Sequence, residues 1–336
     1  MNRRIVITAL GIAQILSWGC SYYLPAVLAG PIAADTGWPF TWVVAGLSAG
    51  LLCSGLASAF TGSFIQRNGG RPVLIAGAIL LASGLVVMGL APNLPVYFLA
   101  WILMGLGMSA SLYDAGFGTL GRLYGKDARG AITSLTLFGG FASTVCWPLS
   151  AFLVEHFGWR ATCFTYAGIQ LVVSLPAFLM LVPAAPGIAG SGIAPPPGAG
   201  SSVHRPTFVL LACITALAAM IASMLSVHLL TVLQLRGIDL AVAVGLGTLI
   251  GPSQVGARVV EMMIGKYHHP LWTMLASVLL LAAGTGLLLT GWPVTALALI
   301  LYGAGNGVHT IARGVLPLVL FDPHRYASIM GRLAVP

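Results

Sequence analysis

The sequence predicts an all-α polytopic membrane protein with about ten transmembrane helices. Of its 336 residues, 58% are apolar and only 7% are charged, and the mean hydropathy is +0.97. A soluble globule of this length needs more polar groups to cover its surface. The apolar residues also gather in runs of roughly 20, the length at which a helix crosses a hydrocarbon core about 30 Å thick.

Ten apolar segments are long enough to be spans. They cover residues 6–30, 41–62, 73–91, 95–121, 132–154, 160–183, 207–232, 241–262, 272–290 and 294–320. Several contain Gly or Pro, which membrane helices tolerate because neighbouring helices satisfy or cover the exposed backbone.

The basic residues predict that the N-terminus lies in the cytoplasm, because cytoplasmic loops retain Lys and Arg. With that orientation, twelve of the 15 Lys and Arg residues fall on the cytoplasmic side, Arg160 and Arg236 fall outside, and Arg313 lies within a span. The net charge of +8 is scattered between apolar segments. It therefore marks topology in a bacterial inner (plasma) membrane and gives no basic stripe for nucleic acid.

A polar-to-neutral stretch rich in Pro, Gly and Ser divides the chain. It predicts a cytoplasmic linker at 184–206, between a six-helix half at 1–183 and a four-helix half at 207–336. Glycines at offsets of 2 and 11 recur in the fourth and tenth spans, as Gly105, Gly107, Gly116 and Gly303, Gly305, Gly314. This recurrence indicates shared packing in two related halves, although chance is an alternative in a chain with 43 glycines.

A basic, glycine-rich turn lies between the second and third spans. Residues 62–71 resemble the loop signature of the major facilitator superfamily, Gly-x-x-x-Asp-Arg-x-Gly-Arg-Arg. Gly62, Arg67, Gly69 and Arg71 match it, whereas Gln66 and Gly70 depart from it. The resemblance implies a cytoplasmic gate at this loop. The family's carboxylate latches helix ends through charge pairs and a helix dipole, so a latch at neutral Gln66 must be weaker or built from hydrogen bonds.

Three further segments are similar to the same family. Gly158-Trp159-Arg160 resembles the Gly-Trp-Arg found between helices five and six. The segments 22–25 (Tyr-Tyr-Leu-Pro) and 35–38 (Asp-Thr-Gly-Trp) resemble the entry region of the monocarboxylate and oxalate/formate branch. The resemblance implies a secondary transporter with two six-helix halves and alternating access to one central site, here lacking the last two helices.

A charged group inside a span predicts the substrate site, because an ionisable side chain at the bilayer centre survives mostly where it faces a cavity or a partner. Arg313 follows His309 by four residues and Asn306 by seven, so the three project from one helical face. A guanidinium grips a carboxylate with two parallel hydrogen bonds. This face therefore predicts an anion site, with Tyr22 and Tyr23 as further cavity-lining candidates.

Asp114 in the fourth span is the candidate carboxylate for coupling or gating. It precedes Arg122 by eight residues, about 12 Å at helical rise, which places it well inside the membrane. It is suited to bind and release a coupling proton, or to pair with Arg313 when the site is empty. Alternatives remain open: a structural Asp114–Arg313 pair, an Arg313 that snorkels to the interface, a packing His309, and interfacial tyrosines.

Cofactors and metals are not indicated. The five cysteines are scattered without Cys-x-x-Cys spacing, and His268-His269 has no carboxylate or third ligand at a suitable spacing. Arg258 and Glu261 are three residues apart, which is typical of an ordinary ion pair at the inner end of the eighth span. No phosphate-binding Gly-x-x-x-x-Gly-Lys-Ser/Thr loop occurs, so ATP does not drive this chain.

These observations predict a non-enzymatic secondary transporter of a small organic anion of the monocarboxylate kind. Arg313, Asn306, His309, Tyr22 and Tyr23 would bind the substrate, Asp114 would carry the coupling proton, and Arg67 and Arg71 would belong to the gate. One alternative is an efflux pump for lipophilic or drug-like compounds, if Arg313 is permanently neutralised. Another is a non-transporting sensor or truncated pseudotransporter, motivated by Gln66 and the two missing helices.

Overall fold

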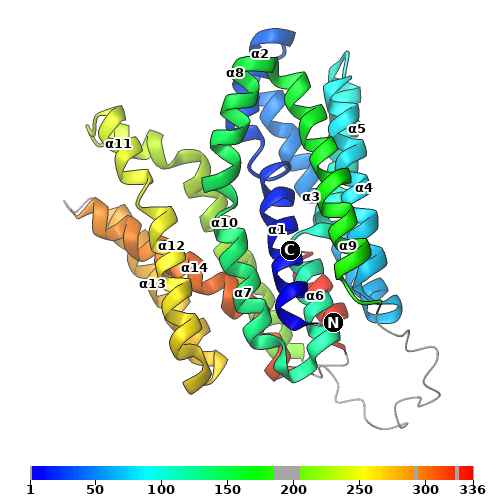
Figure 1. Ribbon diagram of the computed structural model, residues 1–336. Coiled ribbons are helices and arrows are strands. Elements are labelled where there is room, and N and C mark those ends of the chain that lie inside the picture. The colour runs from blue at the N-terminus through cyan, green and yellow to red at the C-terminus, as the bar shows by residue number, and fades with distance from the viewer. Residues whose placement is uncertain (1, 185–204, 291–293, 322–324, 336) are drawn as a thin grey trace. The chain divides into compact units, whose positions relative to one another are not determined.

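The computed structural model describes residues 2–184, 205–290, 294–321 and 325–335, and every regular element among these residues is a helix (Figure 1). The chain divides into two compact units, described separately here. The first comprises residues 1–199 and 322–335, and the second comprises 200–321 with residue 336. Most of the predicted linker, 185–204, lies outside the described residues, so the boundaries of the predicted halves stay predictions.

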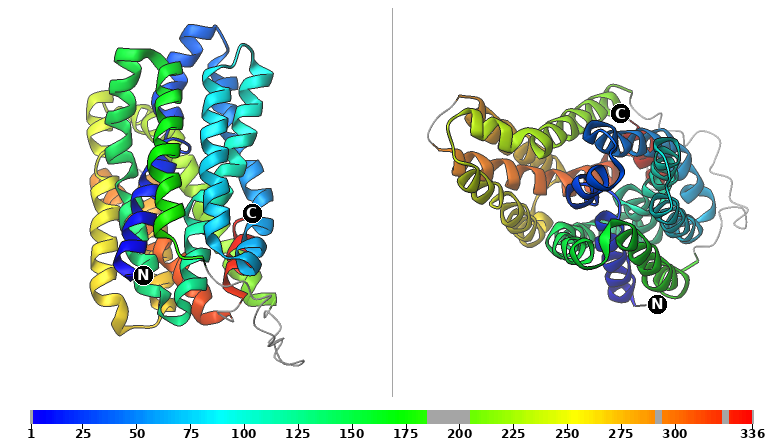
Figure 2. Two further views of the ribbon diagram at one scale, coloured as in Figure 1. Left: turned by 45° about the vertical axis from the view of Figure 1, so that its right-hand side comes forward. Right: turned by 90° about the horizontal axis from the view of Figure 1, so that it is seen from above.

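Among its described residues, the first unit contains ten α-helices. They are α1 (Arg3–Gly19), α2 (Pro25–Thr36), α3 (Phe40–Asn68), α4 (Gly70–Gly89), α5 (Leu94–Ser111), α6 (Tyr113–Tyr124), α7 (Ala128–Gly140), α8 (Ala142–Ile169), α9 (Leu175–Leu181) and α15 (Tyr326–Leu333). Helices α3, α4 and α5 lie side by side in this unit (Figure 2). A π-helical turn, Gln170–Ser174, joins α8 to α9.

Polar caps and breaks in this unit follow from local sequence. The Asn2 and Asn93 side chains accept hydrogen bonds from the first backbone N–H groups of α1 and α5. The predicted first span, 6–30, is two helices, because α1 ends at Gly19 and Pro25 begins α2. The predicted fourth span is also broken, at Leu112, whose extended backbone separates α5 from α6.

Two glycines with positive φ make the sharp turns of the predicted motifs. Gly69, at φ 88°, ends α3 and precedes α4, and Gly158, at φ 78° and ψ 167°, interrupts α8. Residues with a Cβ rarely adopt this region, so both turns depend on glycine. The break at Gly158 falls between the predicted spans 132–154 and 160–183.

In the part of the second unit that the structure describes, there are five α-helices. They are α10 (Arg205–Leu235), α11 (Leu240–Gly247), α12 (Ile250–Ile264), α13 (Pro270–Thr290) and α14 (Thr295–Leu320). Residues 265–267 form a single 3-10 turn between α12 and α13. Helix α14 packs along α13 and α12 and carries the residues predicted to bind an anion.

The recurring glycines make equivalent helix contacts in the two units. In the first unit, a Cβ at Gly105 of α5 would lie 3.0 Å from the Gly50 carbonyl carbon of α3, and one at Gly107 would lie 2.8 Å from Leu81 N of α4. In the second, a Cβ at Gly303 of α14 would lie 2.7 Å from Ile250 O of α12. One at Gly305 would lie 2.6 Å from Leu281 N of α13. The predicted shared packing is confirmed for these two pairs of glycines.

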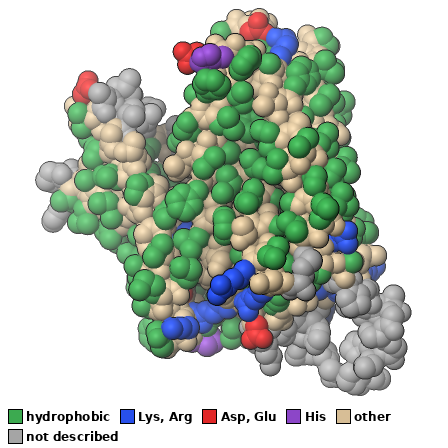
Figure 3. Space-filling view, in the orientation of Figure 1, with side chains coloured by type: hydrophobic (Ala, Val, Ile, Leu, Met, Phe, Trp, Pro, Cys, Tyr) green, Lys and Arg blue, Asp and Glu red, His purple; other side chains and the backbone are tan. Residues whose placement is uncertain are grey.

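The outer surface of the first unit is apolar over its middle. Leu52, Leu56 and Phe60 recur every four residues along α3 and are between 67% and 75% exposed. Figure 3 shows hydrophobic side chains across this unit's visible face and charged side chains near its two ends. In water such a surface would aggregate, whereas hydrocarbon solvates it, which is the pattern of an integral membrane protein.

Six helical stretches of the described residues are long and apolar enough to cross a membrane. They are Phe40–Asn68, Gly70–Gly89, Leu94–Tyr124, Ala128–Leu181, Arg205–Leu225 and Pro270–Thr290. The stretch Ala128–Leu181 covers two predicted spans, and α1 has only 17 residues because it ends before Pro25. The count of ten spans and the cytoplasmic N-terminus stay predictions.

Candidate functional site

The predicted loop 62–71 is mostly helical, because α3 extends to Asn68 and α4 begins at Gly70, which leaves only Gly69 between them. Its α3 part contacts α15, near the end of the chain. Gln66 Oε1 accepts a hydrogen bond from the backbone N–H of Ala327, in the first turn of α15, at 3.2 Å. Arg122 of α6 donates to the Gln66 backbone carbonyl, and Arg71 donates to the carbonyl of Leu179. The neutral residue at the position of the family's carboxylate thus contacts a helix N-terminus through a hydrogen bond.

The other positions of this loop differ in their surroundings. Arg67 is exposed. Gly70, where the family pattern has Arg, is buried against Thr119 of α6, whose side chain occupies the place that a Cβ would take. The departure at Gly70 therefore accompanies close packing of α4 on α6.

A glycine crossing holds α15 against α3. A Cβ at Gly62 would lie 2.9 Å from Gly331 Cα, and a Cβ at Gly331 would lie 2.9 Å from Gly62 Cα. Ser63 and Ser328 hydroxyl oxygens lie 3.5 Å apart beside this crossing. Gly62 therefore serves close backbone approach, which the sequence motif by itself does not show.

Asp114 lies beside the same crossing, inside the first unit. It is half-buried in the first turn of α6, and it lines a small void together with Thr61, Gly62, Ser109 and Gly331. The break at Leu112 creates a helix N-terminus at this point, where a negative charge is favoured by the helix dipole. Asp114 and Arg313 belong to different units, and their pairing stays a prediction.

The predicted anion-binding face of α14 is partly buried. Asn306 and Arg313 are half-buried, whereas His309 is 6% exposed and its Nδ1 lies 3.4 Å from Ser277 Oγ of α13. His309 therefore packs towards α13, which favours the packing alternative for this residue. The other ring nitrogen, His309 Nε2, is buried without a hydrogen-bond partner.

A second arginine, Arg258 of α12, contacts α14. The sequence predicts only an ordinary ion pair with Glu261 for this residue. It is only 4% exposed, its Nε donates to Gly307 O at 3.3 Å, and its Nη2 donates to Thr310 Oγ1 at 3.4 Å. Thr310 precedes Arg313 by one helical turn. Arg258 lay within the predicted span 241–262, so the rule applied to Arg313 would also have selected it.

Glu261, one turn after Arg258, is the sole acidic residue in residues 250–321. Its Oε1 accepts a hydrogen bond from Thr273 Oγ1 at 2.9 Å, and its Oε2 lies 3.5 Å from His268 Nε2. The spacing of residues in the sequence did not point to this contact between Glu261 and His268. Because Arg258, Lys266 and Arg313 share this segment, its formal charge stays positive.

Tyr22 and Tyr23 belong to an aromatic cluster in the first unit. The Trp18 ring centroid lies 5.4 Å from that of Tyr22 and 5.1 Å from that of Tyr113, and the Tyr23 centroid lies 6.0 Å from that of Trp147. Trp147 also lines an open groove of about 480 Å³ between α2 and α8, with the hydroxyls of Ser143 and Thr144. We call these five rings the aromatic cluster.

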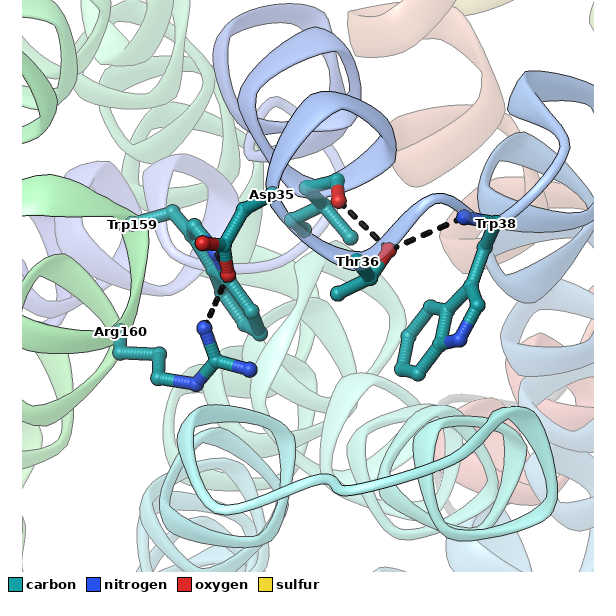
Figure 4. Close-up of polar contacts among 6 residues, drawn as sticks. Asp35, Thr36, Trp38, Trp159 and Arg160 are labelled. Atoms are coloured by element: carbon teal, nitrogen blue, oxygen red, sulfur yellow. Dashed lines mark hydrogen bonds and ion pairs between the residues drawn. The ribbon is translucent and has the colours of Figure 1, made fainter.

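Two sequence motifs that are far apart in the chain meet at one end of the first unit (Figure 4). Trp159 Nε1 donates to Asp35 Oδ2 at 2.9 Å, and Arg160 donates to the same oxygen. The Arg160 guanidinium lies 4.2 Å from the centroid of the Trp159 ring. These donors lower the pKa of Asp35 below its ordinary value, chiefly through the Trp159 N–H.

Within residues 2–184, 205–290, 294–321 and 325–335, no group of three or more His, Cys, Asp and Glu residues could hold a metal ion.

The model of the Major Facilitator Superfamily matches residues 10–335. Monocarboxylate transporter 3 of Rattus norvegicus is 32% identical over 152 residues, which are 44% of this chain and 30% of that protein. Monocarboxylate transporter 11 of Mus musculus is 27% identical over 292 residues, which are 85% of this chain and 58% of that protein. The chain thus matches between about a third and three fifths of these relatives' length.

Solved structures share the fold at low sequence identity. The human organic anion transporter MFSD10 (TETRAN) aligns with a TM-score of 0.76 and 17% identity over 100% of this chain and 90% of that one. The transporter FucP in the outward conformation aligns with a TM-score of 0.77 and 14% identity over 99% of this chain and 89% of that one.

Proposed function

Because the chain belongs to the major facilitator superfamily, a family of membrane transporters and not of enzymes, we propose that it carries a small organic anion with a carboxylate by alternating access. The observation that carries this proposal is that two arginines meet one stretch of α14: Arg258 reaches it from α12, and Arg313 lies on it. Arg258 contacts Gly307 and Thr310, and Arg313 follows one turn later. Similarity to monocarboxylate transporters of rat and mouse supports a carboxylate substrate.

The charge on this stretch favours an anion for a physical reason. A buried or half-buried guanidinium in a membrane segment is costly unless opposite charge or hydrogen bonds compensate it. Glu261 supplies one negative charge within 250–321 against two arginines and one lysine. A substrate carboxylate would add the second negative charge and would accept hydrogen bonds in the planar geometry that a guanidinium offers.

Asn306, His309, Tyr22 and Tyr23 are the remaining proposed substrate residues. Asn306 is half-buried on α14 and supplies amide donors to an oxyanion. His309 would hold this face of α14 against α13 through its contact with Ser277. The tyrosines belong to the aromatic cluster, which would favour the apolar part of an organic anion over a wholly polar one.

The glycine-rich loop and Asp114 are proposed as gate and coupling residues. Gln66 reaches the first turn of α15, Gly62 meets Gly331, and Asp114 lines the void beside this crossing. Arg67, Gly69 and Arg71 complete the loop. Protonation of Asp114 would remove a charge from the N-terminus of α6 and so change the stability of this contact. The bias of the basic residues supports a cytoplasmic N-terminus, and the proposed location is an inner (plasma) membrane.

The experiment is ligand-dependent thermal stabilisation of the purified protein. A ligand at 100 times its Kd stabilises the folded state by about 2.7 kcal/mol, so small carboxylates and lipophilic cations can be compared directly. We expect one class of carboxylate to raise the unfolding temperature of the parent and of Arg236→Ala, whose arginine is exposed in the same unit. Arg313→Ala should abolish this response. Undiminished carboxylate stabilisation in Arg313→Ala would remove Arg313 from the site.

Efflux of lipophilic compounds is a second candidate, favoured by the aromatic cluster and its groove of about 480 Å³. Apolar walls with few polar groups suit such ligands. In that case, only lipophilic cations would stabilise the parent, Trp147→Ala would abolish the effect, and Arg313→Ala would retain it. Such a result would replace the anion proposal.

A further inference from the structure

Neither proline nor glycine accounts for the break between α5 and α6. Residues 109–115, Ser-Ala-Ser-Leu-Tyr-Asp-Ala, contain neither of them. Leu112 has φ −80° and ψ −166°, which is extended backbone and neither a left-handed nor a π-helical turn. Sharp breaks in helices also arise where a side chain inserts into the ladder of backbone hydrogen bonds. A side chain from a neighbouring helix is therefore the expected cause.

Gln14 of α1 is the side chain that contacts this break. It is only 1% exposed, and its Nε2 donates to the backbone carbonyl of Ser111, the last residue of α5, at 2.6 Å. In a continuous helix this carbonyl would accept from the N–H four residues later, which belongs to Ala115. The Gln14 amide thus takes the place of a backbone donor.

The two partners of the Gln14 amide determine its orientation. A carbonyl oxygen only accepts hydrogen bonds, so the atom that faces Ser111 O must be the nitrogen. Trp18 Nε1 only donates, so the atom that faces it at 3.1 Å must be the oxygen. A reversed amide would lose both hydrogen bonds. Gln14 is therefore held in one orientation by two groups that cannot exchange their roles.

Gly116 of α6 leaves room for this amide. A Cβ at Gly116 would lie 3.1 Å from Gln14 Nε2 and 2.9 Å from Leu135 Cδ2, closer than most real Cβ contacts. Gly116 is the third glycine of the recurring pattern in the predicted fourth span. Gly105 and Gly107 of that pattern meet the backbone of other helices, whereas Gly116 accommodates a side chain.

The membrane environment makes this contact important. A backbone carbonyl released by a break inside a membrane segment must find another donor within the protein, because hydrocarbon offers none. Ser111 is fully buried, and Gln14 supplies the donor. The break in turn leaves Asp114 in the first turn of α6, where the helix dipole favours a negative charge.

We propose that Gln14 is the positioning residue of this break. Its amide keeps α5 from continuing into α6, and so keeps Asp114 at a helix N-terminus. Without the amide, Ser111 O would accept from the N–H of Ala115, and Asp114 would lie inside one continuous helix. A role of Asp114 in gating or coupling rests on the proposed function. Its position does not, so a test without substrate separates the failure of one from the failure of the other.

The test is amide hydrogen exchange of Ala115 in the purified, substrate-free protein, with Gln14→Met as the main variant. Methionine is also unbranched but has no hydrogen to donate to Ser111 O. The Ala115 N–H is among the first four of α6, which a helix leaves without an intrahelical carbonyl. If the helix becomes continuous, this N–H gains one. Its exchange should then slow by about fivefold or more, the change that one typical hydrogen bond makes in an opening equilibrium. Loss of packing alone would make it faster.

Two control variants keep the contact with Ser111. Trp18→Phe removes the donor to Gln14 Oε1, and Ser21→Ala removes a buried hydroxyl that donates to Ser17 O. Both should keep the parent's exchange at Ala115. Unchanged or faster exchange in Gln14→Met would overturn the proposal, and so would equal slowing in either control. If Gln14→Met does not fold, Gln14→Asn decides, because its amide is one methylene shorter and should not reach Ser111 O; it too should slow the exchange.

Discussion

Replacing Gly331 with alanine should detach α15 from α3. The added Cβ would overlap the carbonyl oxygen of Ser58 and lie 2.9 Å from Gly62 Cα, closer than real Cβ contacts come. Both atoms belong to helix backbone, so α15 must move as a whole. Such overpacking costs about 1–3 kcal/mol. The movement also breaks the hydrogen bond from Ala327 to Gln66, which contributes about 1 kcal/mol.

Alanine also favours the helix over glycine by about 1 kcal/mol, which offsets the lost hydrogen bond. The net expectation is a loss of about 1–3 kcal/mol, measured as a lower unfolding temperature of the purified protein. Amide hydrogen exchange in 326–333 should become faster, because the backbone of α15 is released. Gly168→Ala in α8 is the matched control, since nothing lies within 4 Å of its added Cβ. Unchanged stability and unchanged exchange in Gly331→Ala would refute the close crossing.

Two further predictions concern other contacts of the first unit. Trp159 and Arg160 donate hydrogen bonds to Asp35 and hold its pKa in the folded protein below the ordinary value. The ionised Asp35 therefore stabilises the fold at a pH above its pKa in the unfolded chain. This stabilisation is lost as the pH falls through the lower pKa of the folded state. Asp35→Asn should therefore lower the unfolding temperature at pH 7, and this difference from the parent should shrink as the pH falls below the ordinary pKa of an aspartate. A difference that stays constant down to acidic pH would contradict this. Gln66→Glu should stabilise the contact with α15 by about 0.3–1 kcal/mol, because it places a negative charge at the N-terminus of that helix. The exchange of the Ala327 amide should then be slower. In Gln66→Leu the hydrogen bond is lost, and this exchange should be faster. Equal exchange in the parent and both variants would show that this contact does not hold α15.

Several features of this protein are determined by local sequence. Composition and the length of the apolar runs determine that this is a helical membrane protein. In hydrocarbon every backbone N–H and C=O group must be hydrogen-bonded within the protein, and a helix does this within a single segment. The glycine-rich loop at 62–71 identifies the family, and its turn depends locally on Gly69, whose φ is 88°. The repeated glycines could also be recognised in the sequence, because two helices that approach closely require small residues at their contact.

Tertiary structure decided the partners of the polar residues. The sequence placed Arg258 beside Glu261. Only the packing of the helices brings the Arg258 guanidinium to Thr310 of α14, and only the fold brings His268 to Glu261. The apolar pattern predicted a continuous fourth span. The helix is nevertheless interrupted at Leu112, which leaves Asp114 at the N-terminus of a new helix. A periodic pattern specifies which face of a helix is apolar, whereas the position of a partner depends on how distant helices pack.

The same distinction explains the two motifs that meet in the first unit. Sequence similarity identified Asp35 and Trp159 separately, but they lie 124 residues apart and are joined by one hydrogen bond in the folded chain. Likewise, a latch at neutral Gln66 was expected to be weaker or built from hydrogen bonds, and in the fold Gln66 accepts a hydrogen bond from the Ala327 amide, 261 residues away. Local sequence determined what each side chain can donate or accept, and tertiary packing determined its partner, because the free energy of packing depends on surfaces from the whole unit.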